Sequence, residues 1–383
     1  MNTHYIPRLL LRPFATGEKI NSYDFSTESF YTKKLKHTFA ENDLYDSELE
    51  KAFASKMEGP VGNLLNNKLL AGKTISMDRK ENMLLRKFLM MNFLRSPIVN
   101  QTWDEMVEKM QMQDHPSVQT REFLLRQNPE LKEYFEKGIP SKDSFVSDLK
   151  LAMEYDTLER MLAPENVEKI SMSLQVSAQH AMVTAIAFWD SEESGQEFIL
   201  PKLPGVSMMD QVSVFHKSLI IRNEKTKIKN PKVKECLKFE LNRLEYGSML
   251  YSENFSIYPI SPTRVLICFS PYFRAFFPFM DFTNTLQVYP PLLDQAQFDR
   301  HFFEPMRMEL FRPCETICNK FYRYDVKSLT AEEVMQLNAL LLNLEMEEFV
   351  FHDYNKIRDS FWYYDKKARF AMEKRHNFCH IEN

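Results

Sequence analysis

The segment that organises the rest of this sequence is the N-terminal run His4-Tyr5-Ile6-Pro7-Arg8-Leu9-Leu10-Leu11-Arg12-Pro13-Phe14. Pro7 fixes φ and has no amide donor, and steric conflict with its ring favours an extended conformation at Ile6. The imidazole of His4 and the guanidinium of Arg8 are therefore held close to a rigid proline. This pattern is typical either of a reaction centre or of an anchor that holds a chain end in a core.

The composition indicates a globular protein. With 383 residues, 44% hydrophobic and 13% aromatic, the chain can bury the core of one large domain or two ordinary ones. The formal net charge of -4, with both signs mixed along the chain, argues against a general nucleic-acid coat protein. Only 8 glycines are present, so glycine-rich nucleotide loops are not expected.

Cysteine use and hydropathy predict a cytoplasmic location. The opening residues are too charged and too short for a signal peptide, and five cysteines, an odd number, are widely spread. We therefore expect reduced thiols. The longest apolar runs, such as Phe276-Phe277-Pro278-Phe279-Met280, are too short to cross a bilayer, so no membrane association is expected.

The first half of the chain is expected to be helical after an initial hairpin. Alternating polar and aromatic positions predict the hairpin within residues 16–40. A helix with Leu49, Phe53 and Met57 on one face should follow, with Glu58 on that face before Gly59-Pro60 interrupts it. A strongly apolar helix should begin at Arg79 and end before Pro97.

The middle third is expected to supply strands, and the last third helices. Short β-branched or aromatic runs predict strands at 198–200, 212–215, 218–221 and 265–269. Thr330-Ala331-Glu332-Glu333 is a capping box that opens a helix. A last helix, aromatic and basic at once, should begin near Tyr354.

These elements predict a mainly helical α+β fold. A helical N-terminal half and C-terminal helices should pack against a small, mostly antiparallel sheet. We expect a single integrated domain over residues 1–383. Its sub-regions are 1–40 (N-terminal motif and hairpin), 41–190 (helical), 191–325 (strand-rich) and 326–383 (C-terminal helices).

Two local patterns favour structural interpretations. Gly72-Lys73-Thr74 resembles the end of a phosphate loop, but Asn67 stands where the first glycine belongs, so a helix C-cap at Gly72 is favoured. The alternating lysines from Lys225 to Lys234 are typical of a solvated edge strand, with a phosphate-contacting hairpin as the alternative.

A dispersed set of ionisable residues in the N-terminal half forms the candidate site. The expected catalytic residues are His4, Asp43 and Glu58, and the expected substrate-binding residues are Arg8, Tyr45 and Arg95. If the hairpin folds back on the helices, His4 would meet Asp43 or Glu58, with Arg95 compensating the carboxylates. Such a set suits general acid–base chemistry or one divalent metal ion. A buried ion-pair network that fixes the N-terminal segment is the structural alternative.

Several segments also carry a family resemblance. The opening reads His4-Tyr5-Ile6-Pro7-Arg8, then Leu11, Arg12 and Phe14. Further matching segments are Tyr23-Asp24, Glu41-Asn42-Asp43-Leu44-Tyr45, Glu58-Gly59, Phe88 through Arg95-Ser96-Pro97, Phe198-Ile199, Tyr258-Pro259-Ile260-Ser261-Pro262 and Leu337-Asn338. In this order they resemble the domain-of-unknown-function 4238 family of bacteria and fungi. The resemblance implies no particular activity.

One departure from the family pattern bears on the chemistry. Where the family usually has Phe-Ile-Thr-Ser-Asp-x-Pro, this chain has Phe198-Ile199-Leu200-Pro201-Lys202-Leu203-Pro204. If that segment contributed a carboxylate to a site, Lys202 reverses its sign. This lowers the expectation of a metal-dependent hydrolase.

Two functions are therefore expected from the sequence. The first is a hydrolase that acts on a phosphodiester or another anionic substrate, with His4 as general base or ligand. The second is a non-enzymatic interaction or defence-associated module, whose aromatic-basic C-terminal helix contacts a nucleic acid or protein partner.

Overall fold

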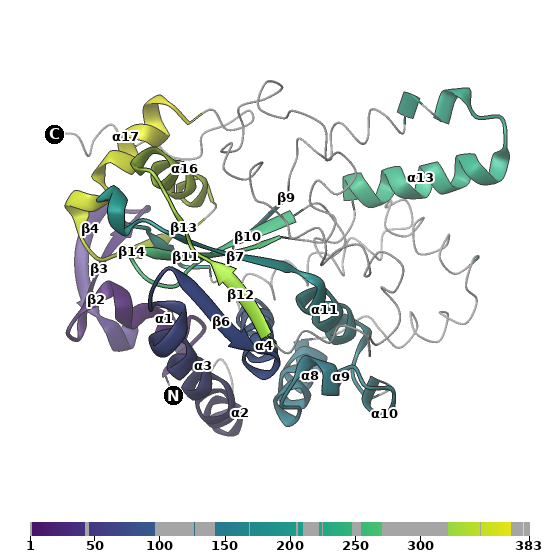
Figure 1. Ribbon diagram of the computed structural model, residues 1–383, viewed down its shortest axis with the longest axis horizontal. Helices are drawn as coiled ribbons and strands as arrows, with labels where there is room; N and C mark the ends of the chain where they lie inside the picture. Colours follow the sequence, from purple (N-terminus) through teal and green to yellow (C-terminus); the bar gives the residue numbers. More distant parts are fainter. Residues whose placement is uncertain are drawn as a thin grey trace.

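The computed structural model describes residues 2–42, 46–95, 126, 142–167, 169–203, 206–209, 222–223, 225–246, 254–269, 321–344, 346–368 and 378. Helices and mostly antiparallel sheets are interleaved along these residues (Figure 1). The predicted α+β class is therefore confirmed. Among the described helices, none is long and apolar enough to cross a membrane.

The described elements have the following bounds. The strands are β1 (Asn2–His4), β2 (Ala15–Thr16), β3 (Lys19–Asp24), β4 (Ser29–Lys34), β5 (Ala40–Asn42), β6 (Thr74–Asp78), β7 (Ala185–Asp190), β8 (Leu200–Pro201), β9 (Val206–Met209), β10 (Asn254–Pro259), β11 (Arg264–Phe269), β12 (Phe321–Asp325), β13 (Lys327–Ser328) and β14 (Glu348–Phe351). The α-helices are α1 (Arg8–Leu11), α2 (Ser47–Ala52), α3 (Gly59–Leu64), α4 (Arg79–Leu94), α8 (Lys142–Glu154), α9 (Leu158–Met161), α10 (Pro164–Val167), α11 (Met172–Val183), α13 (Pro231–Tyr246), α16 (Ala331–Leu342) and α17 (Arg358–Lys366). The 3-10 helices are η1 (Arg12–Phe14), η2 (Leu35–His37), η6 (Glu192–Ser194) and η10 (Tyr354–Lys356), and the π-helices are η3 (Phe53–Glu58) and η4 (Leu65–Leu69).

A five-stranded sheet in the order β13-β7-β11-β10-β9 lies at the centre. Helix α4 lies on one side of it and α16 on the other (Figure 1). Strand β11, which the sequence predicted at 265–269, is buried along its whole length. Leu266 and Cys268 pack into the core that contains α4, whereas Val265, Ile267 and Phe269 pack into the core that contains α16.

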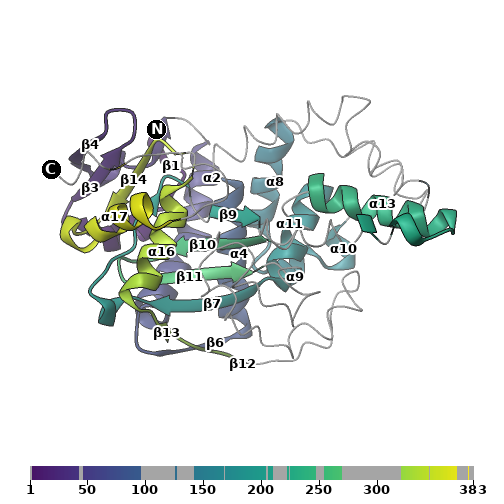
Figure 2. The same cartoon turned by 90° about the horizontal axis from the view of Figure 1, so that it is seen from above.

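A second sheet joins the two ends of the chain. The predicted hairpin is confirmed as β3 and β4, which are connected by residues 25–28. Strand β14 pairs antiparallel with β3, and Phe349 stacks on Tyr23 with ring centroids 5.3 Å apart. The sequence predicted one small sheet from the middle third and a separate hairpin, so this second sheet, which contacts between the two ends of the chain build, was not predicted (Figure 2).

Capping boxes define the starts of two core helices. The predicted box at the start of α16 is confirmed: Thr330 accepts from the amide of Glu333, whose carboxylate accepts from the amide of Thr330. Asp78 and Glu81 form the same reciprocal pair at the start of α4. Both boxes satisfy amides that have no partner inside the helix.

Two local predictions were wrong. Lys225 and Lys227 lie in helical residues, and Lys232 and Lys234 lie on α13, so the alternating lysines do not form an edge strand. Gly59-Pro60 does not interrupt its helix, since π-helical η3 leads directly into α3. A widened π turn accommodates a proline that lacks the amide of a regular helical turn.

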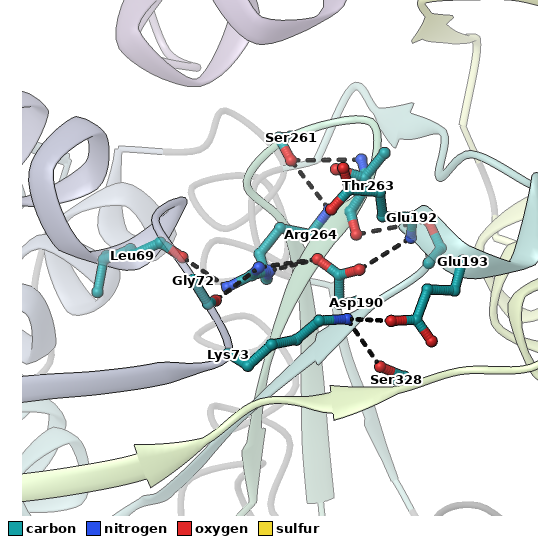
Figure 3. Close-up of polar contacts among 11 residues, drawn as sticks. Leu69, Gly72, Lys73, Asp190, Glu192, Glu193, Ser261, Thr263, Arg264 and Ser328 are labelled. Carbon is teal, nitrogen blue, oxygen red and sulfur yellow. Dashed lines mark hydrogen bonds and ion pairs between the residues drawn. The ribbon is translucent and has the colours of Figure 1, made fainter.

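The Gly72-Lys73 segment serves packing between elements (Figure 3). Gly72 has φ of 77° in the turn that follows η4, and its carbonyl oxygen accepts from Nη2 of Arg264 at 3.2 Å. Lys73 Nζ pairs with Glu193 at 2.8 Å on the surface. The Gly72 carbonyl and the Lys73 ammonium are therefore both paired within the protein, and they do not form a phosphate-binding loop together.

Arg264, at the start of β11, forms a buried ion pair with Asp190, at the end of β7, and this pair joins the two strands. Arg264 Nη2 lies 2.8 Å from Asp190 Oδ2, and Nη1 donates to the carbonyl of Leu69 at 3.0 Å. One guanidinium therefore connects the central sheet to the turn before β6.

Several other predictions, including the strands at 212–215 and 218–221, fall outside the described residues.

We predict that Asp190→Ala lowers the free energy of unfolding by about 3–5 kcal/mol, because the Arg264 charge stays buried without its carboxylate. Lys73→Ala is the matched control, since it removes an exposed ion pair of the same cluster. Urea unfolding followed by circular dichroism measures both. Equal unfolding midpoints for the two variants would show that the buried Arg264–Asp190 pair does not contribute more to stability than the exposed Lys73–Glu193 pair.

Candidate functional site

The N-terminal segment is anchored mainly through its backbone. Strand β1 pairs with β5, which places His4 opposite Ala40, and the amide of Tyr5 donates to the carbonyl of Phe39 at 3.2 Å. Tyr5 and Ile6 are buried. Pro7 caps the short helix α1 with φ of -56° and ψ of 139°, which agrees with the constraint that proline places on this turn.

Arg95 lies at the C-terminal end of α4 and is the centre of the site. Its side chain is 1% exposed. Nη1 lies 2.8 Å from Glu58 Oε1, while Nη2 donates to the His4 carbonyl oxygen at 2.6 Å and lies 3.4 Å from Glu50 Oε1. The guanidinium carbon lies 4.0 Å from the centroid of the Phe53 ring. The N-terminal segment and the α2–η3 run, which are distant from α4 in the sequence, therefore converge on one cation.

The π-helix η3 places the two carboxylates. Glu50 lies on α2 and Glu58 ends η3, and both side chains are mostly buried. Their spacing equals that of Leu49 and Met57, which are buried on the same helical run. That repeated spacing is the signal that sequence analysis missed for Glu50.

The environment of the His4 imidazole favours its neutral form. Burial lowers the pKa of His4, and the charges of Arg8 and Arg95 lower it further. A hydrogen bond to the backbone of Leu35 and the charge of Glu58 act in the opposite direction. His4 Nε2 is buried and has no hydrogen-bond partner. The ring therefore carries one nitrogen that is not used by the fold.

The pKa of Glu50 is raised, which favours its protonated form. Burial raises the pKa of Glu50, the Arg95 charge lowers it in part, and the neighbouring Glu58 raises it. The site thus brings together an imidazole with a lowered pKa and a carboxyl with a raised pKa. Pairs of titratable groups shifted in this way are typical of acid–base centres, although buried ion networks also produce them.

The remaining predicted site residues are placed as follows. The side chain of Arg8 is 41% exposed and lies 3.8 Å from Glu18. Asp43 and Tyr45 lie outside the described residues. Among the residues that are described, no group of three or more His, Cys, Asp or Glu side chains is placed to hold a metal ion.

Lys202 and the C-terminal helix lie outside this cluster. Lys202, directly after β8, pairs with Glu347, directly before β14. On α17, Phe361 and Tyr364 are buried in the core, whereas Trp362 is 42% exposed with Lys367 Nζ 5.3 Å from its ring centroid. Most aromatic surface of α17 is therefore used in packing.

Comparisons with known proteins give one match. The model of a family described as "Protein of unknown function (DUF4238)" matches residues 2–223, which is more than half of the chain. The family resemblance inferred from the sequence is thereby confirmed. No curated protein and no solved structure gives a significant match.

We predict that Arg95→Met lowers the free energy of unfolding by about 3–5 kcal/mol, because it leaves Glu58 and Glu50 buried without their cation. Arg160→Met, which removes an exposed pair with Asp156, should change it by less than about 0.5 kcal/mol. Chemical denaturation of both variants tests the difference. A loss no larger in Arg95→Met than in the control would refute the role of Arg95.

The shifted pKa of His4 predicts a pH dependence of stability. The folded pKa lies below the value of about 6.5 expected in the unfolded chain, so the unfolded state binds the proton first. The contribution of His4 is therefore complete above pH 6.5 and is lost as the pH falls through the folded pKa. Relative to wild type, His4→Gln should lose less stability between pH 7 and pH 5, measured by thermal unfolding; parallel curves would contradict this.

Proposed function

The chain belongs to the DUF4238 family of proteins of unknown function, and we propose that it is a hydrolase acting on a phosphodiester or another anionic substrate at the Arg95 cluster. The observation that carries this proposal is the state of His4. Burial lowers the pKa of the ring and so favours its neutral form, the backbone of Leu35 forms a hydrogen bond with it, and its buried Nε2 has no partner. A fold that needs the ring only for packing would gain by pairing or replacing that nitrogen.

His4 is the general base in this proposal. A neutral imidazole accepts a proton through its unprotonated nitrogen, so it can activate a water molecule for attack on the substrate. The hydrogen bond to the backbone of Leu35 orients the ring. In a base of this kind the lowered pKa keeps the accepting form populated at neutral pH.

Glu50 supports the same chemistry as a proton donor. Its raised pKa favours the carboxylic acid, which can protonate a leaving group. Glu58 is paired with Arg95, and Arg95 also binds the His4 carbonyl. Arg95 is therefore a positioning residue in this proposal, whereas the sequence had suggested that it binds substrate.

Arg8 is the residue proposed to bind the anionic group. Its guanidinium is partly exposed and its contact with Glu18 is long, at 3.8 Å, so a phosphate or carboxylate can compete for it. Asp43 and Tyr45 keep the roles expected from the sequence, as acid–base and substrate-binding residues. A divalent metal ion remains an expectation of the sequence alone.

Turnover of bis-p-nitrophenyl phosphate, with a panel of p-nitrophenyl phosphates and carboxylate esters, tests the proposal. His4→Gln should lower kcat by about 10²–10⁴-fold, since it removes the general base. His37→Gln changes an exposed histidine on η2 and should leave kcat unchanged. Circular dichroism must show that both variants are folded.

The outcome of the panel is decisive in either direction. Loss of turnover in folded His4→Gln, with the His37→Gln rate retained, would support the assignment. Equal rates in the two variants, or no turnover of any substrate by wild type, would reject the hydrolase. The interaction module proposed from the sequence would then be the remaining hypothesis.

A further inference from the structure

Asn92 is a buried amide whose hydrogen-bonding capacity is unused. It lies on α4 and is 1% exposed, and neither Nδ2 nor Oδ1 has a hydrogen-bond partner. Buried polar side chains in native proteins are nearly always paired, because an unpaired group keeps the full penalty of its removal from water. An amide with both ends unpaired therefore requires an explanation.

Other buried polar residues of α4 are satisfied within the fold. Asn82 Nδ2 donates to the Tyr324 hydroxyl at 2.6 Å, and its Oδ1 accepts from Arg86 Nε at 2.6 Å. Arg86 also donates to main-chain carbonyls at the C-terminal end of α11, and Lys87 donates to the carbonyl of Tyr155. The fold thus pairs buried polar groups on this helix, and Asn92 departs from that pattern.

Asn92 lies next to the cluster described above. It precedes Arg95 by three residues, so the two lie on one face of α4 with Cβ atoms roughly 5–6 Å apart. Arg95 binds the His4 carbonyl, and His4 Nε2 and Arg8 Nε are also buried without partners. Elsewhere in the described residues, such atoms occur at Gln196 and His352. Unused donors and acceptors are therefore concentrated around the N-terminal segment.

We propose that Asn92 is a specificity-determining residue that binds a planar group with a hydrogen-bond donor next to an acceptor, on a ligand whose anionic group binds Arg8. A primary carboxamide and the edge of a nucleobase both present this pattern, which an asparagine amide matches with two hydrogen bonds. This inference rests on the proposed function for the site, and it adds the class of substrate.

The free protein provides a first test that needs no ligand. Asn92→Leu replaces the amide with an apolar group of similar shape, so the melting temperature should stay equal or rise. Asn82→Leu is the matched control on the same helix, and it should lower the melting temperature because Arg86 and Tyr324 lose a partner. A comparable fall in both variants would overturn the proposal, since it would mean that buried water or the fold uses the Asn92 amide.

Binding provides the second test, measured by calorimetry with AMP, L-glutamine and inorganic phosphate. AMP or glutamine should bind wild type more tightly than phosphate, and the better of the two identifies the source of the planar edge. In Asn92→Leu, the Kd of that ligand should rise about tenfold or more, while the Kd of phosphate stays the same. An unchanged Kd in Asn92→Leu, or no binding of AMP and glutamine to wild type, would overturn the proposal.

These measurements separate the inference from the proposed hydrolase. Binding is measured without turnover, so a wild type that binds AMP through Asn92 and hydrolyses no ester would retain the binding site and reject the hydrolase. A His4→Gln variant that loses turnover while Asn92→Leu binds normally would support the hydrolase and reject the role of Asn92.

Discussion

The buried guanidinium of Arg95 is the interaction on which the N-terminal half depends. It binds a main-chain carbonyl at residue 4 and two carboxylates on the α2–η3 run, and it stacks on Phe53. Removing a charge from water is costly unless hydrogen bonds and opposite charges compensate it. Here the compensation comes from segments that are distant in the chain, so the pairing fixes how they pack.

Two further buried arginines act in the same way elsewhere in the structure. Arg86 donates to the carbonyls of Ala181, Met182 and Thr184 where α11 ends. Arg264 donates to the carbonyl of Leu69, the last residue of η4, and to that of Gly72 in the turn that follows. The last carbonyls of a helix have no donor within it. A guanidinium presents several donors in a fixed plane, so each of these side chains fixes a helix end to a different layer.

The sequence predicted local features well and long-range contacts poorly. The hairpin, α4, β11 and the box at Thr330 were predicted, because periodicity and capping depend on neighbouring residues. The pairing of β3 with β14 was not, since nothing local in Tyr23 specifies a partner more than 300 residues away. Lys232 and Lys234 were assigned to a strand because lysines alternate along this segment. Without apolar residues that mark a buried face, such alternation does not distinguish a strand from the helix observed here.

At the candidate site too, some residues were predicted from the sequence and others became visible only in the folded structure. His4, Glu58 and Arg95 were selected because they lie at the ends of elements or on an otherwise apolar face. The structure joins them through Arg95, which binds the Glu58 carboxylate and the main-chain carbonyl of His4, not its imidazole. Glu50 was missed because its own neighbours look like an ordinary solvated helix start. Asn92 was missed for a different reason: an unpaired amide is visible only once every possible partner has been placed.

The anchoring of the N-terminal segment explains how one residue can serve both structure and chemistry. Strand pairing with β5 and the hydrogen bond from Arg95 both act on the backbone of His4. The ring is therefore held in position without using its Nε2, and burial keeps it neutral. A carboxylate that anchored the segment through the imidazole would instead raise the pKa of the ring and favour its charged form, which cannot accept a proton. Backbone anchoring thus leaves the Nε2 atom of His4 without a structural partner.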